Sequence, residues 1–219
     1  KAGLTLLGAG VDVSTIVGPH TTGGGDTVLI SAPNVTVDGF TITRTGNTDV
    51  PLGSWAANTQ NQGVNVAAST GATIQNCKIT GNRNGIYVGQ SSHNATIRRN
   101  IIDFNRTGVH LVDNNNVLID ENFITNNWTM GVLYRDEVPL GGPDPTGVVV
   151  RNNNISGNWY SQIEFRDPAG VSIMNMSGNY LGTTNPTRVT TTSLEPGYTA
   201  QIPAAYPGGS AVAPGSPTG

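Results

Sequence analysis

Five short segments of this chain place histidine, tyrosine, carboxylate and arginine side chains at matching positions. The segments read Gly63-Val-Asn-Val-Ala-Ala, Gly85-Ile-Tyr-Val-Gly-Gln, Gly108-Val-His-Leu-Val-Asp, Gly131-Val-Leu-Tyr-Arg-Asp and Gln162-Ile-Glu-Phe-Arg-Asp. The polar residues of interest at positions three, five and six are Asn65, Tyr87, His110, Glu164, Arg135, Arg166, Asp113, Asp136 and Asp167. Position three is expected to face solvent in all five segments, and it holds Asn65, Tyr87, His110, Leu133 and Glu164. Imidazole, phenol and carboxylate groups can move protons, and grouped carboxylates can hold a cation.

These residue types suit removal of a proton from a carbon next to a carboxylate group. Such a reaction needs a group that neutralises the carboxylate, a base and an acid. His110 is the predicted base, with Arg135 or Arg166 as the other candidate, and Tyr87 is the predicted acid. Hydrolysis by a pair of carboxylates, Glu164 with an aspartate, is less favoured because nothing marks either partner as an acid with a raised pKa.

The three aspartates Asp113, Asp136 and Asp167 end successive segments. At the roughly 4.8 Å spacing of neighbouring strands their charges would repel one another. Either Ca²⁺ or the adjacent arginines could neutralise them, and a Ca²⁺ site is therefore a candidate. The alternative interpretation is that each aspartate ends its strand and caps the next turn.

The segments that carry these residues repeat about every 23 residues. The steps from Ile74 to Ile97 and from Asn82 to Asn105 are both 23 residues long. Within the repeats apolar residues alternate with polar ones, which is typical of strands with one buried face. Units this short must stack on their neighbours to bury their apolar faces. We therefore predict an all-β fold, a right-handed parallel β-helix of about six to seven coils with three short strands per coil.

Two asparagine columns should run along such a solenoid. The first holds Cys77, Asn100, Asn122 and Asn153, and the second holds Asn82, Asn105, Asn127 and Asn158. Stacked amides can hydrogen-bond from coil to coil. Cys77 is then expected to be an inert core thiol. In the first coils, Thr15-Ile-Val aligns with Phe40-Thr-Ile and Val28-Leu-Ile with Val64-Asn-Val.

Two insertions and three tryptophans point to the same sheet. The insertions Thr45–Gln62 and Glu137–Thr146 lengthen corners at opposite edges of it, and we expect them to turn the sheet into the floor of a groove. Trp128 and Trp159 share one corner column, and Trp55 lies in the first insertion. With Asn65 they are predicted to bind sugar rings, tryptophan by stacking; the alternative for the pair is packing at a corner of the core.

Residues 4–18, Leu-Thr-Leu-Leu-Gly-Ala-Gly-Val-Asp-Val-Ser-Thr-Ile-Val-Gly, resemble the opening coil of pectin-lyase-like right-handed β-helix proteins. The Asn-x-Ile-x-x-Asn-x-x-Gly-Ile-x-Val repeats resemble carbohydrate-binding and sugar-hydrolase β-helices of that superfamily. The resemblance covers about residues 1–182. It implies a glycan ligand, because the superfamily holds polysaccharide lyases, uronan epimerases, hydrolases, esterases and non-catalytic modules. The Asp-Pro-His-Asp run of its epimerases and the paired-Asp and Gly-His-Gly arrangement of its pectin hydrolases are absent from this sequence.

The composition and the two ends of the chain limit the kinds of partner that the protein is expected to have. Charged residues make up 11% of the 219 residues and the net charge is −3. No basic cluster suggests nucleic acid, and no apolar run is long enough for a membrane span. Residues 183–219, rich in Pro, Gly and Ser, are expected to be an irregular cover strand and linker beyond a β-helix domain at 1–182. Such a tail favours a secreted or cell-surface protein with further domains.

Two functions are consistent with the sequence. The leading interpretation is an extracellular β-helix module that binds polysaccharide along the exposed sheet without catalysis. Regular repeats and a modest charged cluster favour it. The alternative is an enzyme acting on acidic polysaccharides, a uronate lyase or C5-epimerase, that uses the His, Asp, Arg and Glu cluster. An ice-binding surface would need a regular outward column of threonines, which the sequence lacks.

Overall fold

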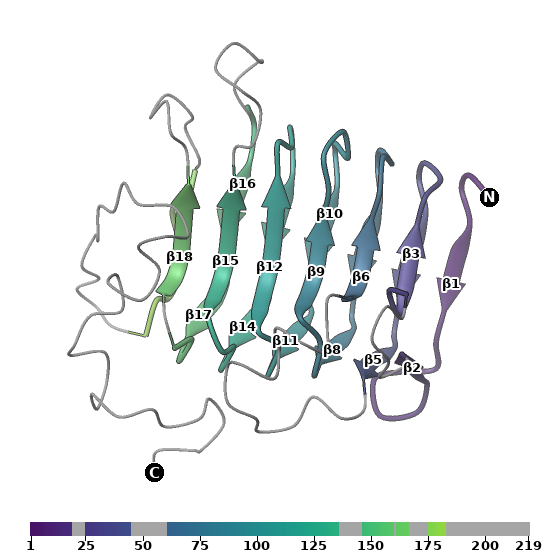
Figure 1. Ribbon diagram of the computed structural model, residues 1–219, viewed down its shortest axis with the longest axis horizontal. Helices are drawn as coiled ribbons and strands as arrows, with labels where there is room; N and C mark the ends of the chain where they lie inside the picture. Colours follow the sequence, from purple (N-terminus) through teal and green to yellow (C-terminus); the bar gives the residue numbers. More distant parts are fainter. Residues whose placement is uncertain (19–24, 45–60, 136–145, 160, 167–174, 183–219) are drawn as a thin grey trace.

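The computed structural model describes residues 1–18, 25–44, 61–135, 146–159, 161–166 and 175–182. In these residues eighteen short strands form three parallel six-stranded sheets, and successive strands enter the three sheets in turn. The chain therefore winds through six coils of three strands each (Figure 1). The predicted parallel β-helix is confirmed. None of the described residues forms a helix long and apolar enough to cross a bilayer.

Each sheet collects every third strand of the chain. Sheet A consists of β1 (Thr5–Leu7), β4 (Thr36–Asp38), β7 (Thr73–Gln75), β10 (Thr96–Arg98), β13 (Leu118–Asp120) and β16 (Val149–Arg151). Sheet B consists of β2 (Thr15–Gly18), β5 (Thr41–Arg44), β8 (Lys78–Thr80), β11 (Ile101–Asp103), β14 (Phe123–Thr125) and β17 (Asn154–Ser156). Sheet C consists of β3 (Val28–Ile30), β6 (Gln62–Val66), β9 (Asn84–Val88), β12 (Thr107–Val112), β15 (Met130–Arg135) and β18 (Ser161–Arg166).

The register of the strands follows the 23-residue period. Ile97 pairs with Ile74, and Val64 pairs with Val28, as the sequence predicted. The predicted alignment of Thr15 with Phe40 is wrong by one residue, because the structure pairs Thr15 with Thr41. A slip of one residue would turn the buried Ile42 of β5 outward and a threonine inward.

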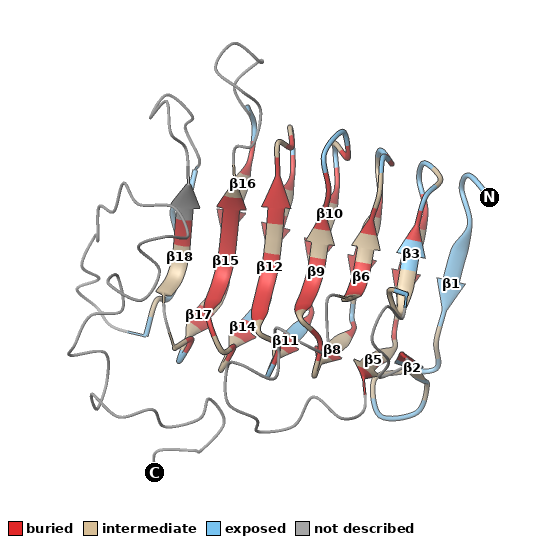
Figure 2. Cartoon of the chain, in the orientation of Figure 1, coloured by how far each residue is buried: buried red, intermediate tan, exposed pale blue. Residues whose placement is uncertain are grey.

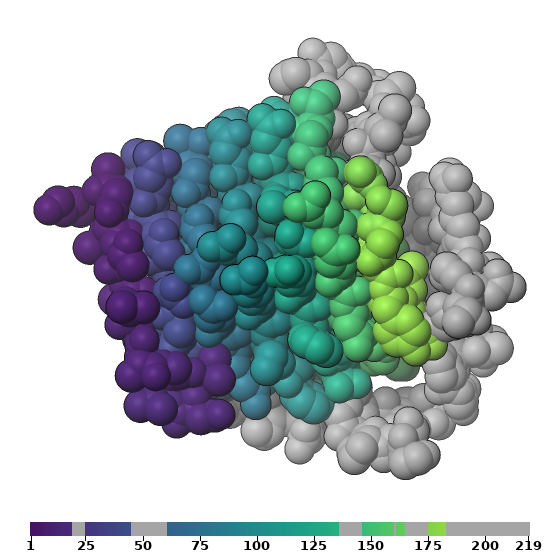
Figure 3. Space-filling model, turned by 180° about the vertical axis from the view of Figure 1, so that it is seen from behind, coloured from purple at the N-terminus to yellow at the C-terminus, as the bar shows by residue number. Residues whose placement is uncertain are grey.

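The core is a set of aliphatic columns that run along the inside of the solenoid. The inward residues of sheet B are Ile42, Ile79, Ile102, Ile124 and Ile155, all fully buried. Sheets A and C contribute matching columns of valine, isoleucine and leucine. Buried residues run along the strands of the middle coils, whereas β1 is exposed over its whole length (Figure 2). Seen from behind, the coils form successive bands along the molecule (Figure 3).

The predicted asparagine columns form hydrogen-bonded ladders at two corners. Asn105 is representative: its Oδ1 accepts the Asn82 backbone N–H at 3.0 Å, and its Nδ2 donates to the Ile79 carbonyl at 2.9 Å. The same pattern joins Asn100 to Asn122 and Asn122 to Asn153. These amides satisfy buried backbone groups at corners where the strand ladder is interrupted.

Glycine precedes the inward strand residues of sheet C for a steric reason. A Cβ on Gly108 would lie 2.5 Å from the Gly131 carbonyl oxygen and 2.7 Å from Cγ2 of Ile124. Gly63, Gly85 and Gly131 meet equivalent contacts. The ladder asparagine and the core isoleucine therefore fill the space that a side chain would need.

Cys77 occupies the position that asparagine holds in the following coils. Its backbone N–H donates to Asn100 Oδ1 at 3.0 Å, and its thiol lies 3.0 Å from the Gln75 carbonyl. The side chain is buried, and burial raises the pKa of the thiol above its ordinary value. This agrees with the predicted inert core thiol.

Candidate functional site

The outer face of sheet C carries the predicted polar column. The register pairs Asn65 with Tyr87, and Tyr87 with His110. All three side chains are partly exposed. Leu29 precedes them in the same column and is exposed as well. The open stretch therefore spans the four neighbouring strands β3, β6, β9 and β12, a length of about 14 Å at the usual strand spacing.

Tyr87 and His110 form the centre of this stretch. Their ring centroids lie 5.1 Å apart with an interplanar angle of 85°, an edge-to-face arrangement. Such aromatic pairs are favourable and hold each ring in place. Gly89 makes room for the pair, since a Cβ on Gly89 would lie 3.0 Å from Cε1 of Tyr87. A phenol and an imidazole thus lie side by side on the neighbouring strands β9 and β12.

A polar network that the sequence analysis missed holds Asn65 in place. Asp26 accepts hydrogen bonds from Asn65 Nδ2 at 2.6 Å and from the backbone N–H of Gln62 at 2.9 Å. Gln62 in turn accepts from Asn84 Nδ2 at 2.6 Å. Asp26 lies 39 residues from Asn65 in the chain. The 23-residue period therefore gave no signal that could have brought the two together.

Arg44 ends β5 beneath this network and is another residue that sequence reasoning passed over. Its side chain is buried, and Nη2 donates to the Gly25 carbonyl at 3.0 Å and to Thr27 Oγ1 at 3.2 Å. Burial lowers the pKa of the guanidinium, while the charge of Asp26 works in the opposite direction. Arg44 therefore supports the first strands of sheet C from inside the protein.

The last two members of the predicted outward column are buried, which corrects the prediction. Leu133 is 4% exposed and Glu164 is 9% exposed, although both were expected to face solvent. Leu133 packs with Met130 and Trp159 in a small apolar cluster separate from the main core. The register is as predicted, with Leu133 between His110 and Glu164. The alternation of apolar and polar residues correctly placed Leu133 and Glu164 on the outer face of sheet C. It could not predict that this face is covered at β15 and β18.

The structure describes two of the three tryptophans that were predicted to bind sugar rings. Trp128 and Trp159 share a corner column, since their backbone N–H groups donate to the carbonyls of Asn105 and Asn127. Both are half-buried, and Trp159 packs against the cluster with Leu133, which is the corner packing considered as the alternative. Trp55 lies outside the described residues, as do most of the two insertions predicted to flank the groove.

The predicted carboxylate and arginine columns are described only in part. Asp113 follows β12 with a φ of 50°, as expected of a turn residue, and its Oδ2 accepts from Gln90 Nε2 at 2.7 Å. Arg135 is half-buried and pairs with Arg166 in the register, and the Arg166 side chain is not described. Asp136 and Asp167 lie outside the described residues. Among the described residues no three His, Cys, Asp or Glu side chains gather as metal ligands. The Ca²⁺ site therefore stays a prediction.

The amino-acid sequence matches a known protein family. Residues 6–139 match the family described as "Right handed beta helix region", and the protein belongs to this family. No curated protein matches the sequence. The resemblance to pectin-lyase-like β-helices is confirmed at the level of fold.

Solved structures of AlgG show the same architecture. The periplasmic alginate epimerase AlgG is 15% identical, with a TM-score of 0.59 over 83% of this chain and 39% of that chain. A mutant of AlgG gives a TM-score of 0.60 over 82% and 40%. The A-module of the mannuronan C-5 epimerase AlgE4 of Azotobacter vinelandii is 16% identical, with a TM-score of 0.41 over 76% and 59%. This chain thus spans about two fifths of AlgG. At these identities the likeness to AlgG shows the fold alone.

Proposed function

We propose that the protein binds a polysaccharide along the outer face of sheet C, over Asn65, Tyr87 and His110. The observation that carries this proposal is the straight column of amide, phenol and imidazole groups on the neighbouring strands β6, β9 and β12. Aromatic rings can stack on the apolar faces of sugars, and an amide N–H can donate to a hydroxyl group.

The geometry of a solenoid supports a polymeric ligand. Equivalent side chains recur at each strand, so a chain molecule lying across the strands meets a similar surface at each step. The rigid backbone below keeps the binding groups in place, which lowers the ordering cost of binding. The similarity in fold to proteins named as alginate epimerases is a further reason to test alginate first.

Affinity electrophoresis in gels that contain alginate, pectate or neutral glucan tests the proposal. We expect at least one polymer to retard the protein. Tyr87→Ala and His110→Ala should each lower the affinity for that polymer about tenfold, which corresponds to a loss of about 1.4 kcal/mol of binding free energy. Thr96→Ala on the outer face of sheet A is the matched control and should behave as wild type. Equal retardation of wild type, both variants and the control would refute binding at this face.

A second candidate function is removal of the C5 proton of a uronate residue, as in an epimerase or lyase. The adjacent Tyr87 and His110 rings favour it, because the reaction needs both an acid and a base. Arg135, Arg166 and Ca²⁺ held by Asp113, Asp136 and Asp167 are the proposed means of neutralising the sugar carboxylate. Buried Glu164 is a less suitable partner.

The second candidate has its own assay. Polymannuronate incubated in deuterated water, with and without Ca²⁺, is examined by proton nuclear magnetic resonance for altered C5 configuration, and by ultraviolet absorbance for unsaturated product. An epimerase or lyase gives one of these signals, and His110→Ala abolishes it. Binding without either signal supports the non-catalytic module. A secreted or cell-surface location fits both candidates, because acidic polysaccharides lie outside the cytoplasm.

A further inference from the structure

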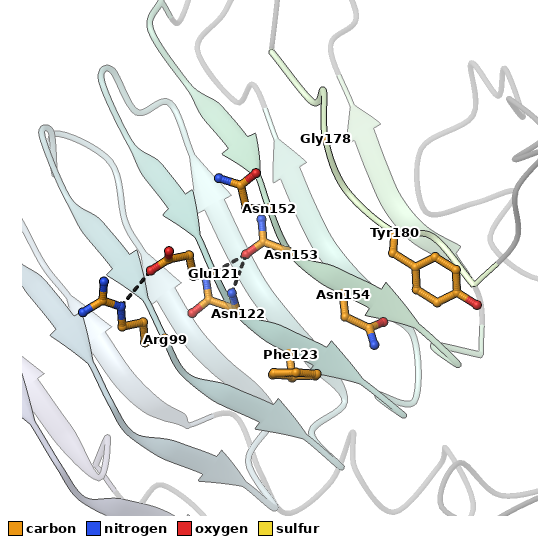
Figure 4. Close-up of a pocket in the computed structure, with 9 residues that line it drawn as sticks. All are labelled: Arg99, Glu121, Asn122, Phe123, Asn152, Asn153, Asn154, Gly178 and Tyr180. Atoms are coloured by element: carbon orange, nitrogen blue, oxygen red, sulfur yellow. Dashed lines mark hydrogen bonds and ion pairs between the residues drawn. The ribbon is translucent and has the colours of Figure 1, made fainter.

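A second surface with ligand-binding groups lies on the outside of the solenoid, where sheet A meets sheet B. It is an open cleft of about 610 Å³ lined by residues of the last three coils and of the segment that follows β18 (Figure 4). The residues that shape it are Arg99, Glu121, Phe123, Asn152, Asn154 and Tyr180. None of them belongs to sheet C, so the cleft is separate from the surface proposed above.

Two exposed aromatic side chains stand in one row across the cleft. Phe123 is 56% exposed and Tyr180 is 53% exposed. Asn154 lies between them, paired with Phe123 on one side and bridged to Tyr180 on the other (Figure 4). The two rings are therefore carried two strand spacings apart, roughly 9.6 Å. That span lets each ring stack on a separate sugar of one extended chain.

The backbone beneath both rings is fixed. The N–H of Phe123 donates to the Asn100 carbonyl at 2.9 Å within sheet B. Tyr180 donates to the Asn153 carbonyl at 2.9 Å and accepts from the Ile155 N–H at 2.8 Å. Single exposed apolar side chains are common on protein surfaces, whereas grouped ones mark interaction sites.

Polar groups complete the cleft. Asn154 Oδ1 accepts from Ser156 Oγ at 2.6 Å, and its Nδ2 donates to no protein atom among the described residues. At the other end Arg99 Nε donates to Glu121 Oε2 at 2.7 Å. This single contact leaves the guanidinium Nη groups and the second carboxylate oxygen for a ligand, as far as the described residues show.

Arg99 and Glu121 occupy equivalent positions in one corner column and have a left-handed backbone conformation, which is uncommon for their residue types. Arg99 has a φ of 54° and Glu121 a φ of 57°, whereas this column otherwise holds Asn76, Asn152 and the glycines Gly39 and Gly178. The left-handed region is unfavourable for ordinary side chains and much less so for asparagine and glycine. An arginine and a glutamate placed here, side by side, are therefore better explained by a contact that they make than by local backbone preference.

The charges of the cleft indicate the kind of ligand. Arg99 is paired with Glu121, and Arg151 with Asp120 at 3.3 Å. Arg99 and Glu121 are the charged residues among those that line the cleft, and as a pair they offer no excess charge for an anion. Aromatic faces together with amide, guanidinium and carboxylate groups suit the apolar face and the hydroxyl edge of an uncharged pyranose.

We propose that this cleft, which we call the corner cleft, binds two or more pyranose units of a neutral polysaccharide, stacked on Phe123 and Tyr180. The proposal does not depend on binding at sheet C. If both hold, the protein links two polysaccharide chains on different faces of one rigid solenoid.

Isothermal titration calorimetry with hexasaccharides of β-1,4-linked glucose, mannose and xylose, and of mannuronate, tests this assignment. We expect at least one neutral hexasaccharide to bind wild type and Phe123→Trp, and to bind Phe123→Ala and Tyr180→Ala about tenfold more weakly or worse. Val17→Ala is the matched control, because Val17 is an exposed apolar residue at the other end of sheet B. Tyr87→Ala tests sheet C in the same series, and both controls should bind as wild type does.

Four results would overturn the assignment: no neutral hexasaccharide binds, binding survives in both alanine variants, Tyr87→Ala removes it, or only the mannuronate hexamer depends on Phe123 and Tyr180. Thermal unfolding of each variant identifies any loss that comes from misfolding. Since both aromatic side chains are exposed, their variants should unfold within a few degrees of wild type.

Discussion

Replacing Asn105 by alanine should strongly destabilise the solenoid, because this side chain connects three coils. Its Oδ1 accepts from the Asn82 backbone N–H at 3.0 Å and from Asn82 Nδ2 at 3.2 Å. Its Nδ2 donates to the carbonyls of Ile79 and Asp103, at 2.9 and 3.0 Å, and to Asn127 Oδ1 at 3.2 Å. The side chain is fully buried, so water cannot replace these partners.

The size of the effect follows from the groups left behind. A buried N–H without an acceptor costs about 1–3 kcal/mol, and each further hydrogen bond contributes about 0.5–1.5 kcal/mol net. Several of the acceptors are carbonyls that can keep other partners, so we expect Asn105→Ala to lower the free energy of unfolding by about 3 kcal/mol.

Urea unfolding followed by far-ultraviolet circular dichroism measures this difference. Asn154→Ala is the control, because Asn154 is a partly exposed asparagine whose side chain hydrogen-bonds only to Ser156 among the described residues. We expect the control to lie within about 0.5 kcal/mol of wild type. If Asn105→Ala is as stable as the control, the ladder is not a source of stability and the reasoning fails.

Three other predictions concern particular positions. Gly108→Ala should destabilise by about 3 kcal/mol or more in the same urea assay, because the new Cβ would meet the Gly131 carbonyl at 2.5 Å, whereas Gly25→Ala, which has open space, should cost little; equal stability of the two would contradict the steric account. Asp103→Asn should stabilise the protein at neutral pH, because burial raises the pKa of Asp103 against the opposing effects of the Thr80 hydrogen bond and the Lys78 charge. The native state therefore binds this proton more tightly than the unfolded state does. The stability gained by Asp103→Asn should be full above the raised pKa and vanish as pH falls below the ordinary aspartate pKa. A gain in stability that is the same at every pH would contradict this reasoning. Cys77 should resist thiol reagents in the native protein and react once urea unfolds it, and rapid labelling of the folded protein would show that the thiol is not buried.

Periodicity was sufficient to predict the parts of the fold that repeat. A 23-residue step aligned Tyr87 with His110, because a parallel solenoid places equivalent residues on neighbouring strands. The same step predicted the Asn82 and Asn105 ladder and its buried hydrogen bonds. These features depend only on the neighbouring coil, so the repeat itself contains the information.

Features that depend on irregular spacing were not predictable. Leu133 and Glu164 sit at outward positions, but their burial depends on what packs over those coils. Asp26 meets Asn65 across 39 residues, in the part of the chain where the period fails. Tyr180 lies in the same row as Phe123 because its backbone bridges to Asn154. The sequence separation between Asn154 and Tyr180 does not match the 23-residue period, so the repeat did not predict this neighbour.

The most direct test of the central proposal is a crystal structure of the protein with an oligosaccharide of the polymer that retards it most. The account predicts sugar density across β6, β9 and β12, with a ring within about 4 Å of Tyr87 or His110. Sugar bound only elsewhere, with the Asn65, Tyr87 and His110 surface empty, would contradict it.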